Sequence, residues 1–443
     1  MKYYLAGIKG TGMSALALIL NDLGFEVVGY DDASEHRFTE NKLIERGIKI
    51  YNGPNDELDE NTIFVYSPAL NKEKHPELLK AKEMGIKIYE YQEMLGKLTK
   101  KFDSICVSGC HGKTTTTSMI SHIFDALGGC NYLIGDGRGQ GARESRKFVL
   151  EACEYRRHFL AYDPEYVIIT NIDLDHMDYF KDIEDIISAY QEFANKASKM
   201  VIACGDDKYT HLLEINPQIY YYGLDDDNDI QAQNIEYSNE GTVFDVIIEG
   251  EYYGHFNLPL YGKHMLLNAL AAIAVCHYER KDARDVAKLL KTFKGAERRF
   301  KETFIGNNVL IDDYAHHPAE VKVTIKAARQ KYPDKKIIAV FKAHTFSRVQ
   351  DFCDEFVNAL NLADKAYIMD INYDREDPAD YPGIDAYTLI NKLNNGDYIE
   401  KGMADKLLQY DNAVILFMSS KEIYLLQNEY QELLKKKLES NEK

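Results

Sequence analysis

Short apolar runs alternate along the chain with stretches in which apolar residues recur every three or four positions. Residues 3–6 form the first apolar run, and residues 13–23 have the spacing of a helix that ends at Gly24. The next strand is predicted at residues 26–29. Because strands that alternate with helices are typical of parallel sheets covered by helices, we predict an α/β protein.

The alternation divides into three units, in agreement with about 150 residues per domain in a chain of 443 residues. The first unit ends near Lys100, the second ends near Arg299, and the third covers the remainder. We predict that the polar and basic stretch 96–101 is a linker between the first two units. Further strands are predicted at 63–66, 86–89, 148–151, 166–170, 200–203, 309–312, 336–341, 365–371 and 413–418, with a β-rich segment at 219–260.

A phosphate-binding loop is predicted after the apolar run 104–107, where Gly109-Cys110-His111-Gly112-Lys113-Thr114-Thr115 precedes a helical pattern. Free backbone N–H groups and the positive end of the helix dipole bind anions at such a turn. Lys113 would reach the β- and γ-phosphates of a nucleotide, and the Thr114 hydroxyl would hold Mg²⁺. The loop is shorter than the general GxxxxGK[ST] pattern, because Val107 stands where that pattern has its first glycine. We therefore predict a protein that binds a nucleoside triphosphate.

A second glycine-rich turn, Gly10-Thr11-Gly12-Met13-Ser14-Ala15, follows the first predicted strand. It fits the dinucleotide fingerprint GxGxxG/A, and Asp31 stands near the position of the ribose-binding acid. NAD, a UDP-type diphosphate and a tight turn without a ligand all satisfy this pattern. The residues alone leave these three interpretations open.

Charged side chains follow predicted strands of the second unit, at the edge where open α/β sheets bind ligands. Glu151 and Thr114 together form a sensible oxygen ligand set for Mg²⁺. His176 is either a further metal ligand or one member of a surface pair with Asp175. Asn268, among alanines and leucines, is either a buried amide paired with backbone or a hydrogen-bonding group for a base edge.

Polar residues also gather at the start of the third unit. Arg299 is either part of a charged linker or a cation that contacts a γ-phosphate when domains close. The run 312–317 follows one predicted strand, and the run 342–348 follows the next. Because both runs contain histidine, and Asp, Tyr or Arg besides, we predict a polar cleft there.

Composition limits the partners of the protein. A formal net charge of -18 argues against a nucleic-acid partner, although a phosphorylated small molecule needs only a few local cations. The seven cysteines are scattered and form no CxxC pair, which is typical of reduced thiols in a cytosolic protein. Neither a secretory signal before Gly7 nor a run of about 18 apolar residues is found, so we predict a cytoplasmic protein without a membrane partner.

In their order along the chain, eight segments between residues 7 and 348 resemble the Mur ligase family: GIKGTGMSALA, GCHGKTTTT, EACEYRRHFL, ITNIDLDHMDYF, GKHMLLNALAA, ERRF, DDYAHHPAE and FKAHTFSR. DDYAHHP and HTFSR resemble the alanine-adding members. The resemblance implies a Rossmann-like UDP-sugar-binding domain (1–100), a central P-loop ATPase-type domain with a mostly parallel sheet that binds ATP and Mg²⁺ (101–299), and a C-terminal Rossmann-like α/β domain that closes over the active site and binds the amino acid (300–443).

The activity that the resemblance implies is ATP-dependent amide formation in peptidoglycan precursor synthesis. The lactyl carboxylate of UDP-N-acetylmuramate would attack ATP, and L-alanine would attack the resulting acyl phosphate, with release of ADP and phosphate. ATP and Mg²⁺, or Mn²⁺ in its place, are the implied cofactors. We expect a monomer or a homodimer whose partners are these small molecules.

The resemblance also assigns roles to residues at matching positions. The catalytic residues would be Lys113, Glu151, His176 and Arg299. The metal ligands would be Thr114, Glu151 and His176. The ATP-binding residues would be Gly109, Cys110, His111, Gly112, Lys113, Thr114, Thr115, His264, Asn268, Arg299 and Asp313. The UDP-sugar would contact Gly10, Thr11, Gly12, Met13, Asp31 and Ser67. The amino acid and acyl group would contact Tyr314, His316, His344 and Arg348.

Two segments depart from the family pattern. EACEYRRHF replaces a more usual EADESD-type string, so residues 154–158 are carried over only weakly, and residues 418–422 stand where a glycine-rich turn is usual. Three alternatives remain at this point: a ligase that attaches a ready-made peptide to the same sugar nucleotide, an NAD-dependent oxidoreductase built on the first glycine turn, and a catalytically silent nucleotide-binding paralogue.

Overall fold

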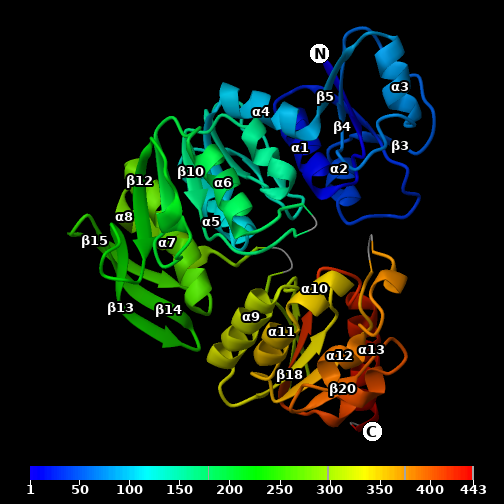
Figure 1. Cartoon of the computed structure of the whole chain (residues 1–443), viewed down its shortest axis with the longest axis vertical. Coiled ribbons are helices and arrows are strands. Elements are labelled where there is room, and N and C mark those ends of the chain that lie inside the picture. The colour runs from blue at the N-terminus through cyan, green and yellow to red at the C-terminus, as the bar shows by residue number, and fades with distance from the viewer. Residues whose placement is uncertain (178, 297–298, 374–375, 442–443) are drawn as a thin grey trace. The chain divides into compact units, whose positions relative to one another are not determined.

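The computed structural model describes residues 1–177, 179–296, 299–373 and 376–441. Its strands form three mostly parallel sheets with helices at their faces, which confirms the predicted α/β class with Rossmann-like terminal domains and a central P-loop sheet (Figure 1). Two compact units make up the chain and are described separately below. The first comprises Met1–Ile235, Phe244–Leu258 and Leu267–Phe293, and the second Glu236–Val243, Pro259–Leu266 and Lys294–Lys443.

The first sheet is fully parallel and has the strand order β3-β2-β1-β4-β5. Its strands are β1 (Lys2–Ala6), β2 (Glu26–Tyr30), β3 (Lys49–Tyr51), β4 (Thr62–Tyr66) and β5 (Lys87–Glu90). Its helices are α1 (Thr11–Asp22), α2 (Glu40–Glu45), α3 (Pro76–Glu83) and α4 (Tyr91–Lys101). The chain leaves β1 toward β2 on one side and places β4 on the other. The carboxyl ends of β1 and β4 therefore flank a topological switch point, where such sheets bind ligands.

The linker predicted at residues 96–101 is wrong, because these residues form the second half of α4. A capping box between Glu90 and Glu93 starts the helix, and Leu95 and Leu98 are buried at helical spacing. A Cβ atom at Gly96 would lie 2.1 Å from the carbonyl oxygen of Ala161, so the glycine permits close packing of the helix. The basic residues that suggested a linker are the solvent-facing side of an amphipathic helix.

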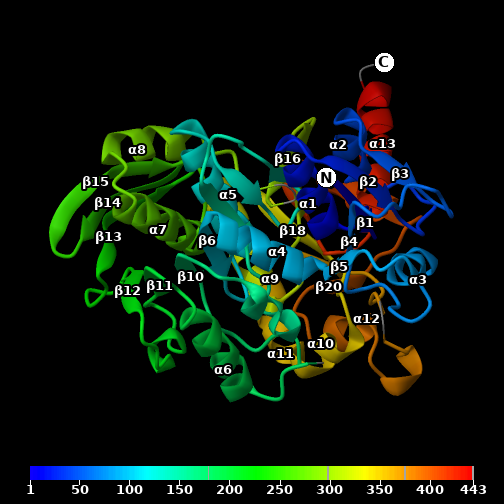
Figure 2. The same cartoon turned by 90° about the horizontal axis from the view of Figure 1, so that it is seen from above.

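The second sheet has the order β15-β14-β13-β12-β11-β10-β6-β9-β7-β8. Its strands are β6 (Asp103–Ser108), β7 (Asn131–Leu133), β8 (Gly139–Gln140), β9 (Lys147–Glu151), β10 (Tyr166–Ile169), β11 (Met200–Cys204), β12 (Gln218–Gly223), β13 (Ile230–Ser238), β14 (Gly241–Ile248) and β15 (Glu251–Leu258). Its helices are α5 (Lys113–Ala126), η1 (Tyr155–Ala161), α6 (Ile183–Ala194), η2 (Thr210–Leu212), α7 (Lys263–Tyr278) and α8 (Ala283–Thr292). Helix α8 packs on β15 (Figure 2). Because β10, β6 and β9 are parallel neighbours, their carboxyl ends lie side by side.

The third sheet has the order β16-β17-β21-β18-β19-β20, and only the β16–β17 pair is antiparallel. Its strands are β16 (Lys301–Ile305), β17 (Asn308–Asp313), β18 (Lys336–Phe341), β19 (Lys365–Ile368), β20 (Gly396–Tyr398) and β21 (Ala413–Met418). Its helices are α9 (Pro318–Lys331), α10 (Phe346–Asp351), α11 (Cys353–Leu360), η3 (Pro378–Asp380), α12 (Ala386–Ile390), η4 (Ala404–Gln409) and α13 (Tyr424–Asn441). Within the described part of the chain, no helix combines the length and apolarity needed to cross a bilayer.

Helix α7 is closely followed by a left-handed residue that is not glycine. Arg280 is exposed and has a left-handed φ of 56°. Its N–H donates to His277 O at 2.8 Å, and Lys281 N–H donates to Cys276 O at 2.9 Å, which is the hydrogen-bond pattern of a C-terminal cap that favours glycine. We predict that Arg280→Gly raises the free energy of unfolding by about 1 kcal/mol, measured by urea denaturation.

The matched control for this change is Arg284→Gly, in the first turn of α8. Arg284 is an exposed helical residue with ordinary backbone geometry, so glycine there is expected to lower stability by about 1 kcal/mol. A decrease in stability for Arg280→Gly as well would contradict the assigned cap.

Candidate active site

The phosphate-binding loop joins β6 to α5, as predicted, and its two glycines have backbone conformations that other residues rarely adopt. Gly109 has φ of 132° and Gly112 has φ of 85°. A Cβ atom would lie 2.0 Å from Thr170 Oγ1 at the first position and 2.5 Å from Asn268 Oδ1 at the second. Both positions therefore require glycine, for conformation and for space.

The end of β10 clamps this loop through two residues to which the sequence analysis gave no role. Asn171 Oδ1 accepts a hydrogen bond from His111 N–H at 2.9 Å, and Asn171 Nδ2 donates to His111 O at 2.8 Å. The hydroxyl of Thr170 donates to the same carbonyl at 2.5 Å. A Thr-Asn pair directly after a buried strand was the available signal for these contacts. A further contact comes from Cys110 in the loop, whose Sγ lies 3.2 Å from the backbone nitrogen of Asp173.

Lys113 is the first residue of α5 and is largely buried, with 14% of its side chain exposed. Its ammonium donates to Gly109 O, to Cys110 O at 3.3 Å and to Glu154 Oε1 at 2.9 Å. Burial opposes the charge on Lys113, but the nearby acidic groups, of which Glu154 has the largest effect, together outweigh burial and raise the pKa of the ammonium. Lys113 is therefore a permanent cation in the loop.

Thr114 and Glu151 lie in direct contact, as their predicted role as metal ligands requires. Thr114 Oγ1 donates to Glu151 Oε2 at 3.0 Å, and Gly135 N–H donates to the same oxygen at 2.8 Å. Burial raises the pKa of the Glu151 carboxyl, although Lys113 and both hydrogen bonds favour its charged form. A half-buried carboxylate beside a hydroxyl fits Mg²⁺, which prefers hard oxygen ligands.

His176 and Glu154 form a second group at the same sheet edge. His176 Nε2 lies 3.7 Å from Glu154 Oε1, and its ring centroid lies 4.7 Å from that of Tyr155. The pairing of His176 with Glu151 as metal ligands stays a prediction. Asp178, in the same motif, lies outside the described residues.

Further residues predicted to bind ATP flank this loop. Thr115 is buried inside α5, and His111 Nε2 lies 3.7 Å from Asp173 Oδ2. Asn268, on α7, is buried with its amide oxygen against Gly112. This burial fits the first of the two interpretations that the sequence left open, and hydrogen bonding to a base edge stays a prediction.

The predicted UDP-sugar residues gather at the switch point of the first sheet. The turn at Gly10 begins α1, and a Cβ atom at Gly12 would lie 2.5 Å from the Tyr91 hydroxyl. Ser67 follows β4, and its N–H donates to Ala6 O at 3.0 Å, which places it beside the turn after β1. Thr11 is exposed in the first turn of α1, whereas Met13 is a core residue, so a ligand could reach Met13 only through its backbone.

Asp31 follows β2, and both of its carboxylate oxygens accept hydrogen bonds from nearby backbone N–H groups. Its Oδ2 accepts from Lys9 N–H at 2.8 Å, and its Oδ1 accepts from Ala33 N–H at 3.0 Å. Lys9 Nζ in turn donates to Ala33 O at 2.7 Å. Asp31 therefore shapes the backbone around the glycine turn.

In the second unit, Asp313 ends β17 and is buried with both oxygens hydrogen-bonded. It accepts from Phe300 N–H at 2.8 Å, from Ala315 N–H at 2.9 Å and from the Thr324 hydroxyl at 3.2 Å. Burial raises the pKa of the Asp313 carboxyl against the opposing effect of Arg299. Asp313 thus fixes the turn that presents the following residues. Glu297 and Arg298 of the same boundary motif lie outside the described residues.

A cluster of rings follows Asp313. The ring centroids of Tyr314 and His316 are 5.3 Å apart, and those of His316 and His344 are 5.6 Å apart. The Arg299 guanidinium lies 5.3 Å from the centroid of the Tyr314 ring. Arg348 lies on α10, four residues after His344. The structure therefore brings four of these five predicted residues together in direct contacts and places the fifth on the next helix.

Glu320 organises this cluster, although the sequence analysis did not select it. Its Oε2 accepts from His316 N–H at 3.0 Å and from His317 N–H at 3.3 Å, and its Oε1 lies 3.5 Å from Arg299 Nη1. His317 and Glu320 form the capping box of α9, with Pro318 in the first helical position. The three-residue spacing from His317 was the signal that could have identified Glu320.

His264 lies in the second unit, at the start of α7. Burial, together with the nearby Arg299, lowers the pKa of its imidazole to about 4. His264 is therefore neutral at physiological pH and can both donate and accept a hydrogen bond.

The unusual segment after β21 has a structural role. Ser419 N–H donates to Asp313 O at 3.0 Å, and its hydroxyl donates to Lys342 O at 3.0 Å. Ser419 thereby ties the ends of β17, β21 and β18 together, directly beside the ring cluster. These serine contacts hold the turn that replaces the glycine-rich form.

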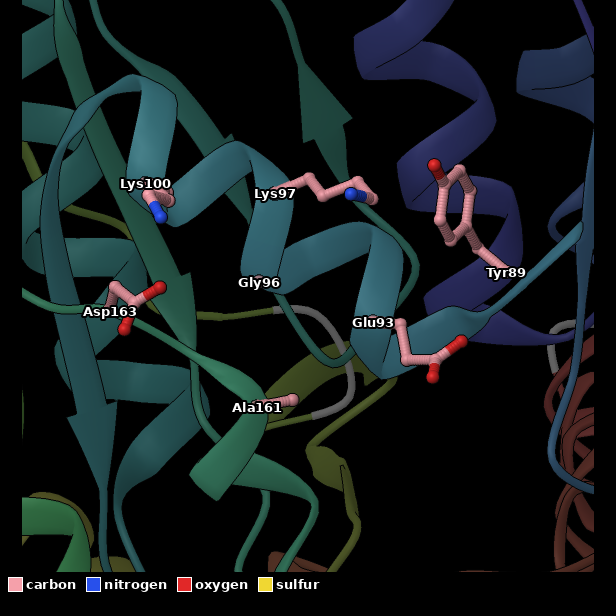
Figure 3. Close-up of a pocket in the computed structure, with 7 residues that line it drawn as sticks. All are labelled: Tyr89, Glu93, Gly96, Lys97, Lys100, Ala161 and Asp163. Atoms are coloured by element: carbon pink, nitrogen blue, oxygen red, sulfur yellow. The ribbon is translucent and has the colours of Figure 1, made fainter. Parts of the chain in front are cut away.

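A cavity of about 350 Å³ lies away from these strand ends, between α4 and the segment after η1 (Figure 3). It is lined by Tyr89, Glu93, Gly96, Lys97, Lys100, Ala161 and Asp163. The lining includes two lysines and two carboxylates, and Lys97 Nζ lies 4.5 Å from the centroid of the Tyr89 ring. None of its residues belongs to the predicted site, and its balanced charge favours no class of ligand.

Comparison with known proteins agrees with this geometry. Residues 2–103 match the description "Mur ligase family, catalytic domain", residues 107–276 match "Mur ligase middle domain", and residues 298–420 match "Mur ligase, glutamate ligase domain". The crystal structure of the UDP-N-acetylmuramate-alanine ligase MurC from Thermotoga maritima is similar over 99% of this chain and 100% of that chain, with 25% identity and a TM-score of 0.79.

Two further solved structures share the fold at lower identity. A murein peptide ligase, mpl, from Psychrobacter arcticus covers 98% of this chain and 99% of its own, with 20% identity and a TM-score of 0.69. The MurF ligase from Thermotoga maritima, in complex with ADP, covers 93% of this chain and 95% of its own, with 17% identity and a TM-score of 0.62. The chain belongs to the Mur ligase family of ATP-dependent, amide-forming ligases of peptidoglycan precursor synthesis.

Proposed function

We propose that this protein joins L-alanine to the lactyl carboxylate of UDP-N-acetylmuramate, with ATP as the source of free energy. The observation that carries the choice of substrate is the likeness to a UDP-N-acetylmuramate-alanine ligase over the full length of both chains, at a TM-score of 0.79. The likeness to a murein peptide ligase extends as far but is weaker, at 0.69.

In the first step, a lactyl carboxylate oxygen attacks the γ-phosphorus of ATP, and the bond from that phosphorus to ADP breaks. In the second step, the alanine nitrogen attacks the acyl carbon, the bond to phosphate breaks, and the nitrogen loses a proton. Both steps build charge on oxygen atoms, so positioned cations and N–H groups supply most of the catalysis. Lys113 and the backbone of the phosphate loop are suited to that task, and Arg299 is proposed to assist them.

Thr114 and Glu151 are proposed to hold Mg²⁺, or Mn²⁺, with His176 as a further ligand. Such a cation would neutralise charge on the phosphate oxygens of ATP. His264, Asn268 and Asp313 are proposed to lie around the nucleotide, with Asp313 acting through the turn that it fixes. Because ATP and UDP-sugars are cytoplasmic metabolites, the proposal implies a cytoplasmic enzyme.

The two Rossmann-like domains are proposed to bind the remaining substrates. The turn at Gly10, with Ser67 at the neighbouring strand end, would receive the diphosphate of the UDP-sugar, and Asp31 would hold that turn in shape. Residues 300–443 would bind L-alanine and close over the acyl group during turnover. Tyr314, His316, His344 and Arg348 supply the polar groups for this role.

The test is ADP release from the purified protein with ATP, Mg²⁺ and UDP-N-acetylmuramate, with single amino acids added in turn. We expect release that depends on the sugar nucleotide and is fastest with L-alanine. Release only with an L-alanyl-γ-D-glutamyl peptide would instead identify a peptide ligase. A protein that releases no ADP with either would contradict the proposed activity altogether.

A further inference from the structure

A buried glutamate that the steps above leave unused lies beside Lys113. Glu154 directly precedes η1, three residues after Glu151, and only 2% of its side chain is exposed. Its Oε1 lies 2.9 Å from Lys113 Nζ and 3.7 Å from His176 Nε2. Among the described residues, no group donates a hydrogen bond to its Oε2. One carboxylate thus faces two residues proposed for catalysis and keeps an unsatisfied oxygen.

The Lys113 ammonium has no spare N–H group with which to bind a phosphate in addition to its present partners. An ammonium has three N–H donors, and Gly109 O, Cys110 O and Glu154 Oε1 accept from all three. A phosphate oxygen can therefore gain a hydrogen bond from Lys113 only if one of these acceptors yields or shares its place. Glu154 is the acceptor that carries a negative charge, so it is the one that a phosphate competes with most directly.

The backbone around Glu154 is held firmly. The next two arginines after Tyr155, Arg156 and Arg157, have left-handed φ values of 52° and 56°, which are costly for residues with a side chain. Arg157 is anchored by its guanidinium, which donates to Asp185 Oδ1 at 2.6 Å. Such strain persists only where surrounding contacts enforce it, and it gathers at functional sites. Glu154 is therefore held beside Lys113 by the fold.

We propose that Glu154 is a positioning residue that orients Lys113 and lowers the affinity of the loop for nucleotide. This inference rests on the proposed function, because it assigns the ATP phosphates as the competitor. The carboxylate holds the ammonium at the mouth of the loop, and its negative charge opposes a bound phosphate. Nucleotide affinity and correct orientation of Lys113 thus work against each other. A role as a metal ligand fits less well, because an ammonium 2.9 Å away repels a divalent cation.

The test is Glu154→Gln, which keeps the volume and one acceptor oxygen but removes the charge. We expect the Kd for ADP without Mg²⁺, measured by titration calorimetry, to fall roughly tenfold, because the negative charge that competes with phosphate for Lys113 is removed. We also expect kcat for L-alanine-dependent ADP release to fall roughly tenfold or more, because the lysine is less well oriented. Loss of a merely structural ion pair would weaken ADP binding and turnover together.

Glu279→Gln is the matched control, because Glu279 also lies in a partly buried pair with a lysine, with Lys147 Nζ at 2.8 Å. Its side chain is 12% exposed, and Lys147 begins β9, at the end of the strand opposite Glu151. We expect no change in ADP affinity or in kcat for this variant.

Glu154→Asp separates the effect of the charge from that of side-chain length. It also provides a test if the glutamine variant does not fold. Aspartate keeps the charge but is one methylene shorter, so we expect ADP affinity close to wild type and a lowered kcat. A folded Glu154→Gln protein that binds ADP no more tightly than wild type would overturn the inference, as would wild-type kcat in Glu154→Asp. If the wild-type protein itself neither binds nor releases ADP, the proposed function fails instead.

Discussion

Replacement of Lys113 by alanine is expected to lower kcat for ADP release by ~10²-fold or more, because the variant loses the cation proposed to face the transferring phosphoryl group. The contact with Glu154 adds a second effect. With Lys113 gone, the Glu154 carboxylate stays buried without its partner at 2.9 Å. Leaving one member of a buried ion pair unpaired costs ~3–5 kcal/mol, so the single variant is also expected to lose stability.

The double variant Lys113→Ala/Glu154→Gln separates these effects. It removes both charges, so we expect the free energy of unfolding in urea to recover most of the loss while kcat stays low. Lys147→Ala, at the far end of β9, is the control for losing a lysine from an ion pair in the same unit, and its turnover should match wild type. A Lys113→Ala protein that keeps more than about a tenth of wild-type turnover would argue against a role for Lys113 in phosphoryl transfer.

The architecture could be predicted because its signals are local. A strand, a glycine turn and a helix are contiguous in sequence, so the spacing from residue 104 to residue 126 was enough to place the phosphate loop. The shorter loop pattern also has a local explanation. Val107 is still inside β6 and pairs with Glu151 of β9, so the turn begins only at Gly109 and no glycine is needed earlier.

The errors in the fold prediction concern segments whose structure depends on distant neighbours. The basic stretch at 96–101 has the composition of a linker, but Gly96 allows its helix to pack against the carbonyl of Ala161. Strand β16 was missed because it is an antiparallel edge strand that contains polar residues and the exposed Phe304. Such an edge lacks the continuous apolar run that identifies a buried strand.

The contacts that organise the site could not be predicted in the same way. Asn171 and Glu154 act on the phosphate loop from 60 and 41 residues away along the chain, and no periodicity joins such positions. Glu320 is the exception, because the capping box of α9 is visible in sequence. Residue type and strand-end position thus identify candidates, whereas the partner of each candidate follows only from the order of strands in the sheet.

Replacement of Glu151 by alanine is expected to abolish metal-dependent turnover while leaving the fold largely intact. The carboxylate stands at the end of β9 and contributes little apolar contact, and burial already disfavours its charged form. The variant loses two hydrogen bonds, from Thr114 and Gly135, which lowers stability. It also removes a charge that burial disfavours, which raises stability. We therefore expect a change in stability of only about 1 kcal/mol.

Glu151→Gln isolates the charge, because its amide oxygen can still accept from Thr114 and Gly135. For the wild-type protein with ADP, added Mg²⁺ or Mn²⁺ should raise Tm, since a cation that binds only the folded state stabilises it. Neither variant should show that metal-dependent shift, and neither should turn over. A Glu151→Gln protein that keeps the shift in Tm would mean that the cation is held elsewhere. If Glu151→Ala were also substantially active, the proposed ligand set at the end of β9 would be wrong, and Thr114 would then act on the phosphates only as a hydrogen-bond donor.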